Sequence, residues 1–406
     1  MLLNDKMPKI AVIQNGLECQ LRSYLISAPT AEQLRTSIIK SLKKQGFRVH
    51  KGVLVIPGEQ TKDAYRKINE QAVAKKRETA FANIGRHEEK LLGYIANGSD
   101  VDPNNILPRL VEVKPKTELE LLFRYASLHW SIPVSSGYGR RLRFLVFDDN
   151  NGKLIGLFGL GDPVFALRAR DQWIGWDSDA RKVNLYHVMD AHVLGAVPPY
   201  SFLLCGKLIA MLALSNEVRE TFRSKYRERE SLISQRVHAP YLTLLTTTSA
   251  LGRSSIYNRI KIRETSYWTS IGFTQGYGEF QFSDGIYDDI RSYVEHHCTA
   301  TARNPEWGEG FRNRREVVKK CLMEIGLSTE LMNHGIKREI FAAPLASNAL
   351  RFLKGQVSRP VFHNWSCEQL AEMHRYRWLL KRAESRPEYM TFRREDYRLW
   401  KQGSGE

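Results

Sequence analysis

The chain has 406 residues, more than one hydrophobic core usually serves, so two or three packing units are expected. Lysine and arginine number 61 against 44 aspartate and glutamate residues, a formal net charge of +17, with most of the excess in residues 1–130 and 291–406. This charge favours a polyanionic partner such as DNA or RNA. The five cysteines are odd in number and form no CxxC pair, which argues against a disulfide framework.

Residues 193–214 are the only stretch that approaches the length of a membrane span. Pro198 and Pro199 divide it and Lys207 interrupts the remainder, so each apolar piece is too short to cross a bilayer. The opening "MLLNDKMPKIAVIQNG" lacks the basic region and the long apolar run of a secretory signal. We therefore expect a cytoplasmic protein without a membrane partner.

Residues 1–130 form the first expected region, and it reads as mostly helical. Residues 30–47 and 64–95 space their apolar side chains three and four apart, with charges between them, as amphipathic helices do. The stretch "VLVIPG" at 53–58 predicts a short strand that ends in a Pro-Gly turn. Residues 97–108 are rich in Gly, Asp, Asn and Pro and predict a loop.

The second expected region, residues 131–290, predicts a mixed sheet with helices on both faces. "RLRFLVF" and "KLIGLFGL" flank the turn "DDNNG" and predict a β-hairpin. The following runs alternate between strand and helix, the order that gives a mixed α/β sheet. Strands are predicted at 192–197, 241–248 and 278–282, and helices at 201–214 and 254–266.

The third expected region, residues 291–406, is basic and predicted to be helical. No Pro-rich or Gly/Ser-rich linker separates it from the sheet region, so we expect it to pack there. Its segments "FRNRREVVKK", "HRYRWLLKRA" and "TFRREDYRLWK" interleave arginines with aromatic residues, which suits phosphate contact and base stacking on single strands. The alternative is a set of ordinary amphipathic helices with charged outer faces. The nucleic-acid contact candidates are Arg375, Arg377, Lys381 and Arg382.

The stretch "PPYSFLLCGKLIAMLAL" follows a predicted strand, and its second half is apolar on all sides, which indicates a buried helix. A strand, a tight turn and a helix start can offer backbone N–H groups to a phosphate, with Gly206 and Lys207 in the first turn. The alternative is that Gly206 permits close packing while Lys207 extends its ammonium group to solvent.

Residues 168–177 gather charged and indole side chains that suit a polar ligand site. Arg170, Asp171 and Trp176 are the candidates, with Asp171 and Arg170 orienting the ligand. The alternative is that Trp173 and Trp176 belong to the core and that Asp177 caps a helix beginning at "SDARKV".

"ALGRSSIYNRIK" follows the predicted strand at 241–248, where the ligands of open α/β sheets usually bind. Its hydroxyl and guanidinium groups suit an anion or a phosphate; alternatively, one serine caps the next helix and the arginines face solvent. Neither a catalytic residue nor a metal site is assigned, because "GRSSI" is no nucleophile elbow and the adjacent His296, His297 and Cys298 lack further ligands. The candidates are Arg253, Ser254, Ser255, Tyr257 and Arg259.

Two resemblances follow from these runs. The strand, loop and helix at 192–214 and the later "IYNRIKIRETSYWTSIGF" resemble the second half of GNAT-type N-acetyltransferases, which implies a GNAT-like central mixed β-sheet. Acetyl-CoA would be the cofactor only under this acyltransferase alternative, since Leu203 and Leu208 stand where the acetyltransferase loop has Arg or Gln and Gly or Ala. Otherwise no cofactor is expected.

A longer resemblance is to the Druantia anti-phage protein A (DruA) family. It is carried by "WSIPVSSGYGRRLRFLVFDD", "IGLFGLGDPVFALRARDQWIGWD", "VMDAHVLGAVPPYSFLLCGKLIAMLA", "SALGRSSIYNRIK" and "HGIKREIFAAPLASNALRFL". The resemblance implies a component of a multi-protein bacterial defence system that includes a helicase-like protein. We expect a nucleic-acid-binding or partner-binding subunit.

Overall fold

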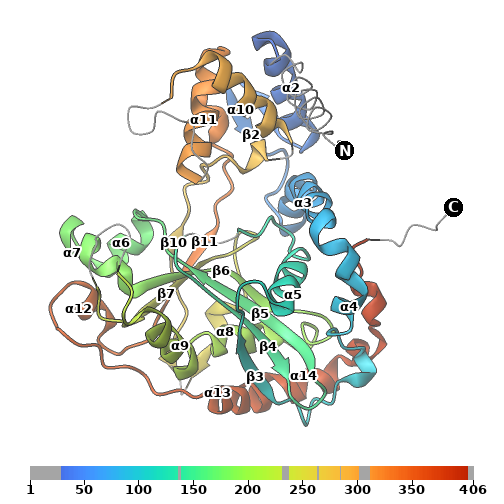
Figure 1. Cartoon of the computed structure of the whole chain (residues 1–406), viewed down its shortest axis with the longest axis vertical. Helices are drawn as coiled ribbons and strands as arrows, with labels where there is room; N and C mark the ends of the chain where they lie inside the picture. The colour runs from blue at the N-terminus through green and yellow to red at the C-terminus, as the bar shows by residue number, and fades with distance from the viewer. Residues whose placement is uncertain are drawn as a thin grey trace, which may run out of the picture. The chain divides into compact units, whose positions relative to one another are not determined.

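The computed structural model describes residues 29–135, 139–230, 237–262, 265–283, 285–300 and 311–400. The chain forms two compact units, each built from two stretches of sequence (Figure 1). Unit 1 comprises residues 1–58 and 277–334, and unit 2 comprises residues 59–276 and 335–406. The boundaries at residues 130 and 290, which separate the three regions expected from composition and sequence pattern, stay a prediction. The compact units are divided at other positions.

Unit 2 is built on a seven-stranded mixed sheet, as the sequence predicts. Its order is β10-β11-β7-β6-β5-β4-β3, and the neighbours pair antiparallel except β6 and β7, which are parallel. The strands are β3 (Pro108–Glu112), β4 (Arg141–Asp148), β5 (Lys153–Gly161), β6 (Val188–Ala196), β7 (Leu244–Thr248), β10 (Thr269–Phe273) and β11 (Glu339–Pro344).

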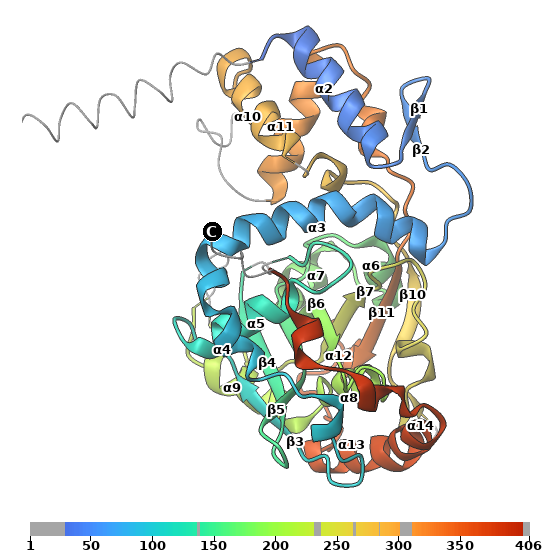
Figure 2. The same ribbon diagram turned by 90° about the vertical axis from the view of Figure 1, so that its right-hand side faces the viewer.

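Helices cover both faces of this sheet (Figure 2). One face packs on α8 (Cys205–Leu212), α9 (Asn216–Tyr226) and α13 (Cys367–His374). The other packs on α4 (Glu88–Leu92) and α5 (Glu118–Ser127), to which the end of α3 (Lys62–Ile84) adds Ile84. A smaller cluster joins α6 (Arg168–Ile174) and α12 (Ala349–Leu353) to the sheet. The remaining helices of unit 2 are α7 (Ser178–Asn184) and α14 (Leu380–Ser385).

The predicted hairpin is confirmed. Strands β4 and β5 pair antiparallel from Arg141 opposite Gly161 to Asp148 opposite Lys153. Their alternate side chains are buried on both faces, so these strands lack the polar face of a solvated antiparallel sheet. Gly152 has φ +71°, the left-handed conformation expected in the turn.

Three sequence expectations are wrong at the level of elements. Residues 254–266 do not form a helix; they form a 3₁₀ turn, Tyr257–Arg259, and the short hairpin of β8 (Lys261–Ile262) and β9 (Thr265–Ser266). Residues 278–282 do not form a strand but end in the 3₁₀ turn Phe280–Phe282. The third region is not helical throughout, because β11 inserts between β10 and β7.

Unit 1 combines an N-terminal segment with the chain inserted between β10 and β11. Its elements are α2 (Ala31–Lys44), the hairpin of β1 (Arg48–His50) and β2 (Val53–Val55), α10 (Ile286–His297) and α11 (Phe311–Glu324). Arg35 on α2 donates to the Ile325 carbonyl at 2.6 Å, and the Gln45 amide donates to the Gln281 carbonyl at 2.7 Å. These bonds join the two stretches of sequence within the unit. Within the described ranges, no helix has the length and apolar character needed to cross a membrane.

Candidate functional site

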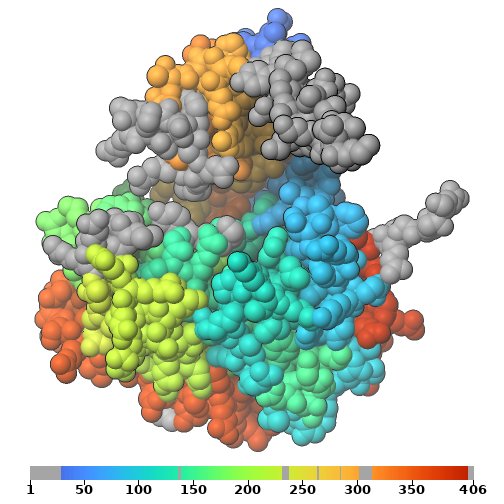
Figure 3. Space-filling model, viewed as in Figure 1, coloured from blue at the N-terminus to red at the C-terminus, as the bar shows by residue number. Residues whose placement is uncertain are grey.

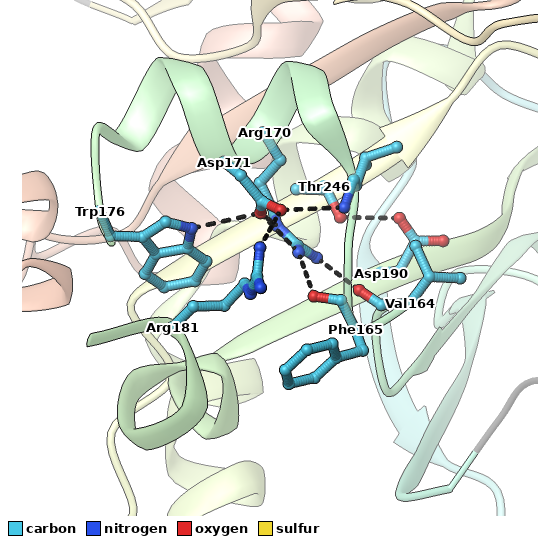
Figure 4. Close-up of polar contacts among 9 residues, drawn as sticks. Val164, Phe165, Arg170, Asp171, Trp176, Arg181, Asp190 and Thr246 are labelled. Atoms are coloured by element: carbon cyan, nitrogen blue, oxygen red, sulfur yellow. Dashed lines mark hydrogen bonds and ion pairs between the residues drawn. The ribbon is translucent and has the colours of Figure 1, made fainter. Parts of the chain in front are cut away.

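The structure brings together the three candidates at the start of the α6–α7 segment (Figure 4). Asp171 lies at the centre: its Oδ1 accepts from Nε and Nη2 of Arg170 at 2.9 and 2.7 Å and from the Trp176 indole at 3.2 Å. Its Oδ2 accepts from Arg181 Nη1 at 3.1 Å and from the backbone N–H of Leu167 at 3.1 Å. Both carboxylate oxygens are therefore occupied by the protein itself.

Arg170 is the most deeply buried charge of this cluster, with a side chain that is 0% exposed. Its Nη1 donates to the Val164 carbonyl at 2.9 Å and its Nη2 to the Phe165 carbonyl at 3.0 Å. Burial lowers the pKa of Arg170, while the charge of Asp171 acts against that shift. The pair clamps the loop before α6 onto the helix, so its donors face the protein and not a ligand.

The alternatives proposed for Trp176 and Asp177 are confirmed, whereas Trp173 is only partly buried, against the same core cluster as Trp176. Trp176 is buried in a core cluster with Ile174 and Phe352. Asp177 is the N-cap of α7, and its Oδ1 accepts from the backbone N–H groups of Asp179 and Ala180 at 3.0 and 2.7 Å. This cap satisfies donors that the helix start leaves open.

A carboxyl group that the sequence did not single out lies beside this cluster. Asp190 on β6 accepts from the Thr246 hydroxyl on β7 at 2.7 Å, across the parallel pair (Figure 4). Burial raises the pKa of Asp190 to about 6, and the Thr246 bond and the charge of Arg170 act in the opposite direction. Only the pairing of β6 with β7 brings these residues together.

The helix start at Gly206 and Lys207 is covered by protein. Lys207 does not reach solvent as the sequence alternative expects: it is 7% exposed, and its ammonium lies 3.4 and 3.3 Å from the carbonyl oxygens of Ser255 and Ile256. The ammonium also lies 5.5 Å from the ring centre of Trp378. Burial lowers the pKa of Lys207, and the charges of Arg259 and Arg377 add to this effect.

Gly206 does not serve close packing. A Cβ added there would meet only the Ile256 side chain, at an ordinary contact distance of 3.7 Å. Leu204, the residue before α8, has φ +61° and offers no side-chain cap, while its carbonyl lies 3.2 Å from the His374 imidazole. The prediction of a buried helix is confirmed, since α8 has seven buried residues of eight.

The five candidates after β7 divide between core and surface. Tyr257 is buried against Trp268 and Phe341, with ring centres 5.1 and 4.9 Å away. Burial raises the pKa of Tyr257 to about 12. Arg253, Ser255 and Arg259 are exposed.

Ser254 bonds locally and to the sheet: its Oγ accepts from the Ile256 N–H at 3.2 Å, and its own N–H donates to Glu339 at 3.2 Å. This is close to the serine cap proposed as the alternative, although the following turn is 3₁₀ and not α-helical. The two exposed arginines agree with the alternative that they face solvent.

Three of the four basic candidates near the C-terminus bind backbone carbonyls of unit 2. Arg375 donates to Ile106 at 2.6 Å, Arg377 to Lys261 at 2.7 Å and Arg382 to Phe202 at 3.0 Å. These bonds hold residues 375–382 against the sheet region, as expected of the third region. Lys381 is exposed. The turn Arg375–Leu379 is π-helical, a geometry frequent at functional sites.

Sequence reasoning missed a groove on unit 2. It has a volume of about 500 Å³ and lies between α3 and the segment that follows α5. Two segments that are far apart in the sequence line the groove. Helix α3 supplies cations, and the segment after α5 supplies an imidazole and an indole. The lining residues are Arg66, Lys67, Glu70, Val73, Ala74, Arg77, His129, Trp130 and Ser131. The helical spacing of Arg66, Glu70 and Arg77 could have indicated a charged face of α3. The groove residues opposite this face, His129, Trp130 and Ser131, lie about sixty residues later in the sequence.

Within the described ranges, no three His, Cys, Asp or Glu side chains gather in a way that could hold a metal ion. The protein has a mixed α/β fold, and its candidate polar cluster around Asp171 is a structural clamp. Its exposed candidate residues are mostly basic and lie on the surface. Residues 59–355 match the family described as Druantia protein DruA. The chain belongs to this family.

A relative named Druantia protein DruA, from Escherichia coli strain UMEA 4076-1, is 42% identical over 374 residues. That match covers 91% of this chain and 90% of the relative. No solved structure matches the chain.

Proposed function

We propose that this protein is a component of a Druantia-type anti-phage defence system and that it binds nucleic acid through the segment Tyr376–Lys381. The family relationship supports the defence role. The observation that carries the binding role is Tyr376, which is 64% exposed on the π-helical turn. An aromatic ring in that position, beside exposed Arg377 and Lys381, suits stacking of an unpaired base next to phosphate contacts.

The segment is firmly supported, which favours a binding surface over a loose tail. Leu379 is buried in the main core, and Arg375 and Arg382 hold carbonyls on either side of the turn. Part of residues 367–385 reaches the surface of unit 2 (Figure 3). A helicase-like protein of the same system is the proposed partner, and a single strand exposed by unwinding is the proposed ligand.

The test compares binding of single-stranded DNA, duplex DNA and RNA by the wild type and by Tyr376→Ala and Lys381→Ala. Loss of one stacked base lowers affinity for single strands by roughly 5- to 100-fold, so Tyr376→Ala should fall in that range with an unchanged salt slope. Lys381→Ala should reduce the salt slope by about 0.7, the value for one phosphate on a single strand. Both side chains are exposed, so thermal melting should not change.

Lys354→Ala is the matched control, because Lys354 is an exposed lysine on a different surface segment after α12. It removes the same charge and should leave the salt slope as in the wild type. Equal affinities and equal salt slopes for all variants would refute nucleic-acid binding here. That result would make the segment a protein-contact surface.

The acyltransferase alternative receives less support. Its cofactor would need the start of α8, where His374 and Trp378 of the C-terminal segment lie over Leu204 and Lys207. Titration with acetyl-CoA remains its direct test, and tight binding that Lys207→Ala abolishes would favour it over our proposal.

A further inference from the structure

The groove between α3 and residues 129–131 combines three kinds of side chain. Arg66, Lys67 and Arg77 are cationic, and Glu70 is the single acidic residue in the lining. Val73, Ala74 and Trp130 supply apolar surface. A volume of about 500 Å³ falls within the range of sites that hold small organic ligands.

Two lining residues of the groove, Arg77 and Trp130, contact other parts of unit 2. Arg77 Nε donates to the Leu128 carbonyl at 3.0 Å, which orients its guanidinium group. The Trp130 indole lies close to the backbone of β6, since a Cβ added at Gly195 would be 3.0 Å from it. These contacts hold Arg77 and Trp130 in position, which lowers the entropy cost of binding against them.

His129 contributes an uncharged polar ring. The imidazole stacks on Tyr397 with ring centres 3.5 Å apart and an interplanar angle of 11°. Burial, with a smaller effect of Arg77, lowers the pKa of His129 to about 3, so the ring is neutral near neutral pH. Its Nε2 is buried and has no hydrogen-bond partner among the described residues, although buried polar atoms are seldom left without one.

These features suit a ligand that is anionic at one end and flat and uncharged at the other. Exposed Lys67 and Arg66, whose Nη1 also pairs with Asp63, supply the anion contacts, while Trp130 and His129 supply aromatic surface. Inorganic phosphate would contact only Arg66 and Lys67, and an apolar ligand would contact only Trp130 and His129.

We propose that this groove binds a nucleotide, with its phosphate against Arg66 and Lys67 and its base against Trp130 and His129. The nucleotide is either a free molecule or one unit of a single strand, and the chemistry is the same in both cases. The site is separate from the segment Tyr376–Lys381 and uses no residue of it.

The test is calorimetric titration of the full chain with adenosine monophosphate, inorganic phosphate and a short oligodeoxyadenylate. Lys67→Ala should weaken nucleotide binding roughly tenfold, the cost of a lost charge-assisted bond. Trp130→Leu should weaken it by a similar factor through lost stacking. Lys62→Ala is the matched control, an exposed lysine on the same helix outside the groove, and should bind as the wild type does.

Trp130 is partly buried, so Trp130→Phe serves as a second variant that keeps the packing and an aromatic face. It should melt as the wild type does and retain most of the affinity. Tighter binding of the monophosphate than of the oligonucleotide identifies a free nucleotide, and the reverse identifies a single strand.

Three results would overturn the proposal: no binding of either nucleotide probe, equal binding of inorganic phosphate and the monophosphate, or affinities that Lys67→Ala and Trp130→Leu leave unchanged. The Tyr376→Ala and Lys381→Ala variants separate this proposal from the proposed function. Binding of the monophosphate in the groove should persist in both variants, whatever they do to nucleic-acid binding.

Discussion

Lys207 shows how burial changes the role of a single residue. Its ammonium is enclosed by two carbonyl oxygens and the Trp378 ring and is almost inaccessible to solvent. We therefore predict that Lys207→Ala lowers the free energy of unfolding by about 1–3 kcal/mol, because the carbonyls of Ser255 and Ile256 lose their donor and the stem leaves a gap. Urea denaturation measures this.

Lys207→Met is the companion variant, since it keeps the length of the stem and removes the buried charge. It should be less destabilised than Lys207→Ala. A Lys207→Ala protein with the stability of the wild type would mean that the lysine reaches solvent after all.

Two glycines of unit 2 differ sharply in what surrounds them. A Cβ at Gly206 has ordinary contact distances, whereas a Cβ at Gly156 on β5 would lie 2.5 Å from the Gly195 carbonyl oxygen. We predict that Gly206→Ala is neutral or stabilises the fold by up to about 1 kcal/mol, the difference in helix propensity. Gly156→Ala should destabilise it by about 1–3 kcal/mol, because the backbone of β6 must move.

Thermal melting of the two variants checks this prediction. A lowered melting temperature for Gly206→Ala would contradict the open space that the structure gives at that position. The same result would revive the close-packing role that the sequence suggested.

At the scale of elements, the clamp between α6 and the loop before it depends on one carboxylate. Asp171→Asn leaves the buried Arg170 guanidinium without the carboxylate that it hydrogen-bonds. Breaking a buried pair from one side costs about 3–5 kcal/mol, and we expect a loss of unfolding free energy in that range. The loop that carries Val164 and Phe165 should become more sensitive to proteolysis, because both carbonyls are held by Arg170.

Asp179→Asn is the matched control, since Asp179 is exposed on α7 and pairs with exposed Lys182. Such surface pairs contribute little, so this variant should keep the stability of the wild type. Similar stabilities for the two variants would show that Arg170 is not a buried cation that needs Asp171.

Residues 254–266 show why one predicted element failed. Ile256, Tyr257 and Ile260 have helical spacing, but Tyr257, Ile260 and Ile262 are all buried in the main core. A straight helix presents one stripe, and residues 257, 260 and 262 do not share one, so the chain turns at Tyr257–Arg259 and continues as β8. Tertiary burial outweighed the local pattern.

At the scale of the whole molecule, burial strongly lowers the pKa of several described histidines of unit 2. The pKa of His129 is lowered to about 3, and those of His187, His192 and His374 to about 4, with burial the largest cause in each. Each folded-state pKa lies below the unfolded value, so the native state binds fewer protons than the unfolded chain between these values. Their stabilising effect is complete above about pH 6.5 and is lost as the pH falls toward 4.

We therefore predict that the unfolding free energy of unit 2 falls between about pH 6.5 and 4, by at most about 1.4 kcal/mol per pH unit for each histidine. Urea unfolding across this range measures the slope. His192→Asn should reduce the slope, because it removes one of these titrating groups. The buried Nδ1 of His192 has no hydrogen-bond partner among the described residues, so the substitution breaks no bond at that atom.

Asp190 has the opposite pH dependence. Its pKa is raised to about 6, so the folded state binds more protons than the unfolded chain between pH 3.8 and 6. The contribution of this group to stability is complete below pH 3.8 and is lost as the pH rises through 6. Asp190→Asn keeps an acceptor for Thr246 and should be more stable than the wild type near pH 7 by about 1–3 kcal/mol. This advantage should vanish near pH 4, and an advantage that is equal at both pH values would contradict the raised pKa.

The sequence by itself determined the local features. β-rich runs on either side of the Asn151-Gly152 turn predict the β4–β5 hairpin, an all-round apolar pattern predicts that α8 is buried, and Asp177 before "SDARKV" predicts a cap. Each depends on residues a few positions apart, where strand and helix geometry set which side chains are neighbours. The long family motifs likewise sufficed for the family.

Only the tertiary structure decided what the polar candidates do. Asp171 became a clamp because five N–H donors from Leu167, Arg170, Trp176 and Arg181 converge on it. Lys207 became buried because a segment about 170 residues later covers α8, and the groove joins α3 to residues 129–131. The physical reason is that burial and convergence depend on which distant segments pack together. The chain pattern near each residue carries no information on that packing.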